Sequence, residues 1–287
     1  MAVIALIPTG KLEHAALGAA LEKLFPGHTF VTRPSESPLD GFTSRDVAPL
    51  VAAQAGPIPT SLEELAAELV NAIFPGRRGE RIDFAYVVED LELFNQHQPQ
   101  LVLNLFRGAV DSYIKQAWPQ QSDSRYAAVR DRCSFHLFRP MTEAYFFGDY
   151  NALARAKTVR SAQLPPNLDL EQFRTVDQEF LDLPAGTNRI CDMPNREVHP
   201  KWYLHYLCDP TLADRSRIYK ETKNGADALR LLDWARVLKV SPHCPFLHAF
   251  LDDLCEALGT RLKFVKSERA DDRVRFPGPG NAILRNM

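Results

Sequence analysis

The feature that most constrains the fold is an alternation of short apolar runs with amphipathic stretches in the first half of the chain. The apolar runs are rich in β-branched and aromatic residues, as is typical of strands, and they cover residues 3–7, 29–32, 82–88 and 134–138. Between these runs, apolar residues recur at the three- and four-residue spacing of helices. Strands separated by helices predict an α/β protein with a Rossmann-like, mostly parallel sheet and helices on both of its faces.

Local signals mark where several helices begin. Ser61 and Glu64 are spaced as in a capping box, in which each side chain satisfies a backbone amide at the start of a helix. A long helix is expected over residues 94–118, and Asp149 is expected to cap a helix over residues 152–156. These helices complete the alternation with the strands.

The pattern changes after Leu164, where proline and glycine interrupt the chain and the clear elements are helices. Apolar spacing predicts these helices over residues 202–207, 226–237 and 245–258. We therefore expect an α/β core over residues 1–164 and a mainly helical region, residues 165–287, packed on it. The tail from Arg269 onward contains a proline- and glycine-rich stretch, for which we expect poor order.

Size and composition are those of an ordinary packed protein. The chain has 287 residues, of which 45% are hydrophobic and 24% charged. It has no run of about 18 apolar residues that would predict a membrane span, and its start lacks the features of a signal peptide. Five cysteines at irregular spacing favour reduced thiols, so we expect a cytoplasmic protein. The net charge of −2 neither requires nor excludes a nucleic-acid partner.

Acidic residues directly follow the best predicted strand. The apolar run over residues 82–88 continues into Glu89, Asp90 and Glu92. Residues two apart on a strand point to one face, so Asp90 and Glu92 can present paired carboxylates at the carboxyl edge of the sheet. Such carboxylates hold Mg²⁺ together with waters and phosphates, and metal-bridged phosphates support phosphodiester chemistry. The alternative is that these acids only begin a polar loop and cap the next helix.

Two further acidic residues are candidates for the same edge. Glu13 lies in the first turn of the helix after the first strand, where a carboxylate can also simply stabilise the helix N-terminus. The turn before it is not a phosphate-binding loop, because Leu12 follows Lys11 where serine or threonine is required. Glu143 follows the fourth predicted strand and is surrounded by apolar residues. Both residues are therefore candidate catalytic groups beside Asp90 and Glu92.

Histidine and cysteine residues gather in the C-terminal half of the chain. None of their spacings completes a standard zinc-binding set. We interpret Cys208, Cys244 and Cys255 as small buried residues, and a zinc-stabilised protein is the least favoured of the alternatives.

Five segments, taken in order, resemble a bacterial family of uncharacterised Toprim-like proteins that are often encoded beside ATPases in defence loci. The segments are VVEDLE at residues 87–92, FRPMTEAYFFGD at 138–149, HPKWYL at 199–204, IYKETKNG at 218–225 and HCPF at 243–246. The resemblance covers most of the chain between about residue 82 and residue 258. It implies a Toprim-like α/β core.

The resemblance also implies a metal site. Toprim proteins use a glutamate after the first strand and an Asp-x-Asp after a later strand to bind Mg²⁺ for phosphodiester cleavage. Asp90 and Glu92 match the Asp-x-Asp, whereas Thr9 stands where the first glutamate is expected. Either another acid such as Glu13 or Glu143 replaces that ligand, or the site is degenerate and inactive.

Two functions follow from these observations. The first is a nuclease dependent on Mg²⁺ or Mn²⁺ that acts on nucleic acid as an effector of anti-phage defence, with Asp90, Glu92 and Glu13 as metal ligands. Tyr219 and Lys220 would then contact a phosphate, although they could equally be a surface pair at a helix start. The second is a catalytically degenerate interaction subunit that binds an ATPase partner or nucleic acid.

Overall fold

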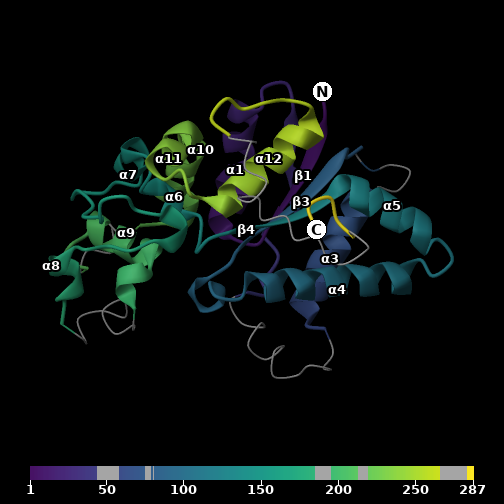
Figure 1. Ribbon diagram of the computed structural model, residues 1–287, viewed down its shortest axis with the longest axis horizontal. Coiled ribbons are helices and arrows are strands. Elements are labelled where there is room, and N and C mark those ends of the chain that lie inside the picture. Colours follow the sequence, from purple (N-terminus) through teal and green to yellow (C-terminus); the bar gives the residue numbers. More distant parts are fainter. Residues whose placement is uncertain (44–57, 75–78, 80, 185–194, 213–218, 266–282) are drawn as a thin grey trace.

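A four-stranded parallel sheet forms the centre of the molecule. The computed structural model describes residues 1–43, 58–74, 79, 81–184, 195–212, 219–265 and 283–287. The strands are β1 (Val3–Pro8), β2 (Thr29–Thr32), β3 (Phe84–Asp90) and β4 (Cys133–Phe138), in the order β2-β1-β3-β4 (Figure 1). All three neighbouring pairs are parallel. The predicted α/β class and parallel sheet are confirmed.

Helices make up the rest of the regular structure. The α-helices are α1 (Lys11–Leu24), α3 (Thr60–Ala72), α4 (Pro99–Ala117), α5 (Ser122–Arg132), α6 (Glu143–Phe146), α7 (Tyr150–Arg155), α8 (Gln178–Leu181), α9 (Pro200–Cys208), α10 (Ala226–Arg230), α11 (Trp234–Val240) and α12 (Pro245–Leu258). Short 3₁₀ turns are η1 (Leu93–Asn95), η2 (Leu170–Gln172) and η3 (Arg196–Val198), and η4 (Glu221–Gly225) is a π-helical turn. Beyond residue 164, the described residues contain helices and turns but no strand.

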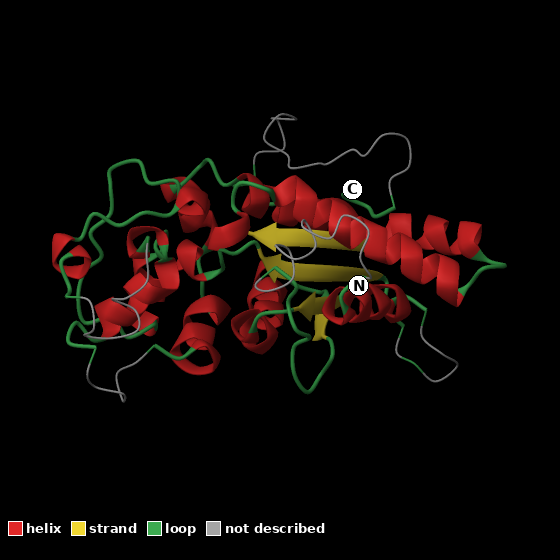
Figure 2. Cartoon of the chain, turned by 90° about the horizontal axis from the view of Figure 1, so that it is seen from below, coloured by secondary structure: helices red, strands yellow, loops and turns green. Residues whose placement is uncertain are grey.

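The two faces of the sheet are covered by different helices, as Figures 1 and 2 show. Successive side chains on a strand point to opposite faces. Tyr86 and Phe138 therefore pack in one core with α1, α12 and the helices between α6 and α11. Val87 and Phe135 pack in the other core with α3 and α4. The first core joins residues on both sides of residue 164, so the C-terminal helices pack directly on the sheet.

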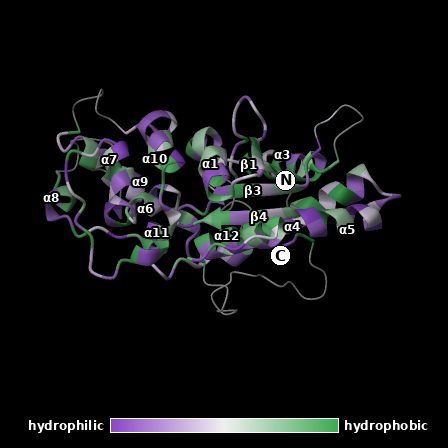
Figure 3. Ribbon diagram, turned by 90° about the horizontal axis from the view of Figure 1, so that it is seen from above, coloured by the Kyte–Doolittle hydropathy of each residue, from purple (hydrophilic) through white to green (hydrophobic). Residues whose placement is uncertain are grey.

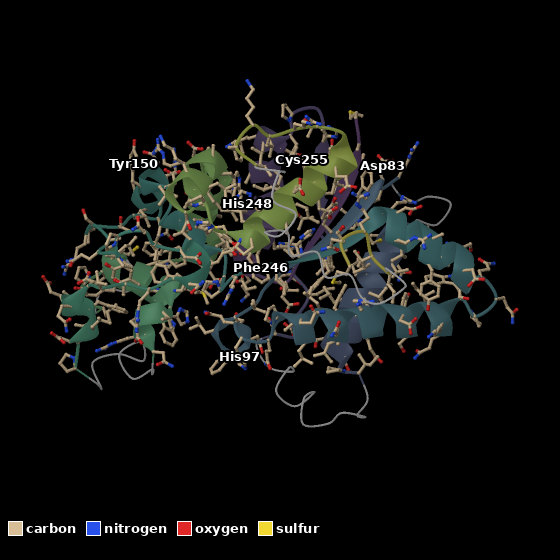
Figure 4. All side chains as sticks on the ribbon, viewed as in Figure 1. Asp83, His97, Tyr150, Phe246, His248 and Cys255 are labelled. Carbon is tan, nitrogen blue, oxygen red and sulfur yellow. The ribbon has the colours of Figure 1, made fainter. Side chains whose placement is uncertain are left out.

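Helix α12 crosses one face of the sheet and runs antiparallel to β4. Figure 4 shows Phe246 at its start, near the middle of the molecule, and Cys255 further along towards Asp83, which precedes β3. Much of α12 is coloured as hydrophobic in Figure 3, in keeping with its buried face. Phe250 of this helix packs edge-on against Tyr86 and Phe138. The helix therefore closes the core over the edge strand β4.

Some predicted helix boundaries hold and others are wrong. Asp149 caps α7 as expected, because its side chain accepts a hydrogen bond from the Asn151 amide. The capping box is wrong: α3 begins at Thr60 and its N-cap residue is Pro59, so Ser61 lies inside the first turn and not at the N-cap position. Pro99, which has no amide hydrogen to lose, begins α4 later than predicted, after the separate turn η1. The single helix expected over 226–237 is two helices, since Asp233 caps the start of α11.

The described cysteines are buried. Cys133, Cys208, Cys244 and Cys255 are free thiols inside the protein, so the interpretation of the last three as small core residues is confirmed. Cys191 lies outside the described residues, as does the tail over 266–282.

Glu171 caps α12 from outside the helix. Its carboxylate accepts hydrogen bonds from the Phe246 amide (3.1 Å), the Leu247 amide (2.8 Å) and the Tyr145 hydroxyl (3.1 Å). Burial raises the pKa of Glu171 to about 8, although these hydrogen bonds act in the opposite direction. The folded protein therefore holds a proton on Glu171 at pH values where the unfolded chain, titrating near 4.5, does not.

We expect Glu171→Gln to weaken the pH dependence of stability. The raised pKa means that the free energy of unfolding falls as pH rises from about 4.5 to about 8, because the folded state binds more protons in that window. Glutamine keeps one acceptor oxygen but does not titrate, so the variant should lose less stability over this range. Urea unfolding between about pH 5 and pH 8 measures the difference. The exposed Glu64→Gln variant is the control, and parallel curves for Glu171→Gln and wild type would contradict the assignment.

Candidate metal centre at the carboxyl edge of the sheet

The candidate residues come from elements that meet at the carboxyl edge of the sheet. Glu13 lies in the first turn of α1, which follows β1. Asp90 is the last residue of β3 and pairs in register with Phe138 at the end of β4. Glu143 begins α6 shortly after β4. Because parallel strands end at the same edge, three distant parts of the sequence deliver carboxylates to one place.

These carboxylates lie in a region of low solvent access. Glu13 is 3% exposed and Glu143 is 2% exposed, while Asp90 and Glu92 are half-buried. Burial raises the pKa of Glu13 to about 7, and the negative charge of Glu143 adds to the effect. Burial also raises the pKa of Asp90, followed by the charges of Glu13, Glu143 and Glu92. Each carboxylate therefore makes it harder for its neighbours to ionise.

Local contacts position Glu13 and Asp90. The Asp90 Oδ1 atom accepts a hydrogen bond from the Thr142 amide at 3.0 Å, which ties β3 to the turn before α6. Glu13 folds back over the turn before α1, since a Cβ atom on Gly10 would lie 1.8 Å from Glu13 Oε2. Only glycine leaves that space free. The Glu13 Oε1 atom is buried and has no hydrogen-bond partner among the described residues.

One lysine faces the carboxylates. Lys201, in the first turn of α9, places its Nζ atom 3.9 Å from Glu143 Oε1 and forms an ion pair with Glu221 of η4. Burial lowers the pKa of Lys201, but the charges of Glu143 and Glu221 outweigh it and raise the pKa above its usual 10.5. The buried Tyr219 hydroxyl donates to Glu143 Oε1 at 3.3 Å. We call Glu13, Asp90, Glu92, Glu143 and Glu221 the carboxylate cluster, which Lys201 faces.

The predicted pairing of Asp90 and Glu92 on one strand face is wrong. Strand β3 ends at Asp90, and Glu92 follows it with a positive φ of 63°. Glu92 nevertheless belongs to the cluster. Burial raises its pKa to about 7, the charge of Lys201 lowers that pKa and the charge of Glu143 raises it. The irregular backbone after the strand, rather than strand alternation, directs Glu92 towards the other carboxylates.

Glu89 belongs to the opposite face of the sheet. Its Oε1 atom accepts hydrogen bonds from the Thr43 amide (2.9 Å) and the Thr43 hydroxyl (2.8 Å). Burial raises the pKa of Glu89 to about 8. Alternation along β3 therefore separates Glu89 from Asp90 and assigns the two acids to different surroundings.

Of the two predicted phosphate-contacting residues, only Tyr219 contacts the cluster, through its hydrogen bond to Glu143. The side chain of Lys220 is exposed, and its backbone amide donates to Asn224 Oδ1 at 2.8 Å. The lysine that faces the carboxylates is Lys201, which was not among the residues predicted from the sequence. Lys201 and Glu221 lie in the segments HPKWYL and IYKETKNG, and a lysine in the first turn of a helix was a further signal, since the helix dipole disfavours it there.

The donor chemistry of the cluster fits a hard divalent cation. Several carboxylates face one ammonium group, and the buried Glu13 Oε1 atom lacks a partner. Carboxylate oxygens are the ligands that Mg²⁺ and Mn²⁺ prefer in proteins. Within the described residues, no three histidine, cysteine, aspartate or glutamate side chains already stand as a ready-made ligand set.

The chain was compared with family models, curated proteins and solved structures. No family model, curated protein or solved structure matches it. The resemblance to Toprim-like proteins therefore stays a prediction. No helix in the described parts of the chain has the length and apolar character needed to cross a membrane.

Proposed function

We propose that this protein is a cytoplasmic, Toprim-like nuclease that depends on Mg²⁺ or Mn²⁺ and hydrolyses phosphodiester bonds. The observation that carries the proposal is the convergence of Glu13, Asp90, Glu92 and Glu143 at the carboxyl edge of a parallel sheet. These four residues were selected from the sequence as candidate catalytic groups. The role in anti-phage defence rests on the resemblance of the ordered segments alone.

Glu13, Asp90, Glu92 and Glu143 would hold the cation. When bound, such a cation supplies charge stabilisation for a phosphate and lowers the pKa of a bound water. The hydrogen bonds from Thr142 to Asp90 and from Tyr219 to Glu143 fix the orientation of two of the ligands. Burial of the cluster strengthens electrostatic interactions, since little water screens them. Among the residues that the structure describes, Lys201 is placed to stabilise negative charge at this edge.

The second candidate function is a non-catalytic subunit that binds an ATPase partner or nucleic acid. The observation in its favour is Thr9, which follows β1 and donates its amide to the Val88 carbonyl at 3.2 Å. A Toprim site would carry a glutamate at this place. A protein that has lost one ligand could keep the fold and use it only for binding.

Cleavage assays distinguish the two functions. We expect the full-length protein to cut plasmid DNA, linear DNA or tRNA in Mg²⁺ or Mn²⁺ and to lose this activity in EDTA. Calorimetry with Mn²⁺ in the absence of nucleic acid should show binding. The physical reason is that the buried carboxylates outnumber the positive charges beside them, so a divalent cation that binds them stabilises their charged forms.

Two outcomes would contradict the proposed nuclease. A protein that binds no Mn²⁺ and cuts none of the three substrates, while binding them or an ATPase in a pull-down, would favour the interaction subunit. Cutting that persists in EDTA would contradict the metal-dependent mechanism. Binding of Mn²⁺ and metal-dependent cutting together would support the nuclease.

A further inference from the structure

Lys201 contacts two carboxylates at the edge of the sheet. Its Nζ atom lies 3.9 Å from Glu143 Oε1 and forms an ion pair with Glu221. Its positive charge also lowers the pKa values of Glu13, Asp90 and Glu92. The Lys201 side chain is 32% exposed, whereas that of Glu143 is 3% exposed, so the ammonium group is more accessible to solvent than the carboxylate that it faces. A divalent cation that binds Glu143 therefore comes close to the ammonium group.

The neighbouring histidines add little positive charge. Burial lowers the pKa of His199 to about 3, and the charge of Lys201 contributes to the shift. Burial likewise lowers the pKa of His205 to about 4, again with a contribution from Lys201. Both rings are therefore neutral near pH 7. Because His199 and His205 are neutral, the positive charge that α9 presents to the cluster comes from the Lys201 ammonium group.

The helix itself does not favour this lysine. Lys201 follows Pro200 in the first turn of α9, and that turn contains no acidic residue. Positive charge at a helix N-terminus opposes the helix dipole, whereas carboxylates are favoured there. The contacts with Glu143 and Glu221 offset this cost, so the position of Lys201 is explained by the carboxylate cluster and not by the helix.

We propose that Lys201 is a built-in counter-ion of the cluster: it holds the carboxylates together in the cation-free protein and competes with the divalent cation for them. This inference rests on the proposed function, because it concerns the same site. A cation that binds Glu143 must weaken the interaction of that carboxylate with Lys201. Metal binding would thereby release the ammonium group from Glu143 and leave it paired with Glu221, at the edge of the sheet where a phosphate would lie.

The test replaces Lys201 in the full chain with methionine, which keeps most of the apolar stem but not the charge. In EDTA, Lys201→Met should unfold at a lower temperature than wild type, because the carboxylates repel one another without it. Calorimetry with Mn²⁺ alone should show binding about tenfold tighter than wild type, since one like charge is removed from the site. Mn²⁺ should also raise the melting temperature of the variant more than that of wild type.

Two comparisons make the outcome decisive. Lys201→Arg keeps the charge and should bind Mn²⁺ no more tightly than wild type, while Lys239→Met removes an exposed lysine of α11 and should change nothing. If wild type binds Mn²⁺ and Lys201→Met binds it equally or more weakly, this inference is overturned and the proposed function stands. Tightening in Lys201→Met and Lys201→Arg alike would also overturn it. If neither wild type nor Lys201→Met binds Mn²⁺, both proposals fail.

Discussion

Asp90→Asn is expected to reduce metal-dependent cleavage at least about a hundredfold and to leave the protein folded. Asparagine keeps an oxygen that can accept the Thr142 amide at the distance of 3.0 Å seen for Asp90, but it carries no charge. Loss of an outer-sphere partner of a metal site commonly costs about 10- to 100-fold, and loss of a direct ligand should cost more. Single-turnover cleavage at saturating Mg²⁺, with circular dichroism to verify folding, measures the effect.

The matched control is Glu64→Gln, which makes the same chemical change on an exposed residue of α3. It should cleave at the wild-type rate. Retention of full activity by Asp90→Asn would exclude Asp90 as a ligand and with it the proposed metal centre. Loss of activity in Glu143→Gln as well would indicate that the ligand set extends to α6, as the coupling of the two carboxylates suggests.

The strands and the location of the site could be predicted because both depend on local patterns. β2 matches its predicted residues, β1 and β4 each differ by one residue at one end, and β3 begins and ends two residues later than predicted. Once the sheet is known to be parallel, acids that follow different strands must gather at one edge. Glu13, Asp90 and Glu143 needed no further information to be brought together.

Details that depend on distant contacts could not be predicted. Lys201 faces the cluster because α9 packs near α6, a contact between distant segments that the first-turn lysine alone does not specify. Lys220 is the lysine adjacent to Tyr219 in sequence, yet its side chain is exposed while Tyr219 is buried against Glu143. Neighbours in sequence thus differ in environment, and only the tertiary fold distinguishes them.

The position of Glu92 could not be predicted from the sequence for a different reason. Its spacing from Asp90 is right for one face of a strand, but the strand ends and the chain turns with a positive φ at Glu92 itself. A residue other than glycine in that conformation is strained and must be held by its surroundings. The ladder continues only as far as Asp90, and then the Leu91 and Glu92 amides donate to the Phe138 and Pro140 carbonyls at 2.8 and 2.9 Å. These contacts with the chain after β4 fix the turn that carries Glu92 to the cluster.

A buried ion network joins α12 to the sheet, and its loss is expected to lower the stability of the fold strongly. Asp253 accepts hydrogen bonds from the Ser134 hydroxyl (2.5 Å) and from Arg285 (3.1 Å), and His136 Nε2 lies 3.0 Å from its carboxylate. Burial acts to raise the pKa of Asp253, but His136 and Arg285 outweigh it and lower the pKa below 3.8. The charged form is therefore the one that the fold stabilises.

Asp253→Ala is expected to lower the free energy of unfolding by about 3–5 kcal/mol, because it leaves Arg285 without its carboxylate partner in a partly buried site. Urea unfolding near neutral pH measures the loss. Since the pKa of Asp253 is depressed in the folded state, its contribution to the free energy of unfolding is present above the unfolded pKa of 3.8 and disappears as pH falls through the lower folded value. The difference in the free energy of unfolding between Asp253→Ala and wild type should therefore become smaller in acid. Asp227→Ala, which removes an exposed ion pair with Arg230, should cost at most about 1 kcal/mol. An equally small loss in Asp253→Ala would mean that hydrophobic packing alone holds α12 on the sheet.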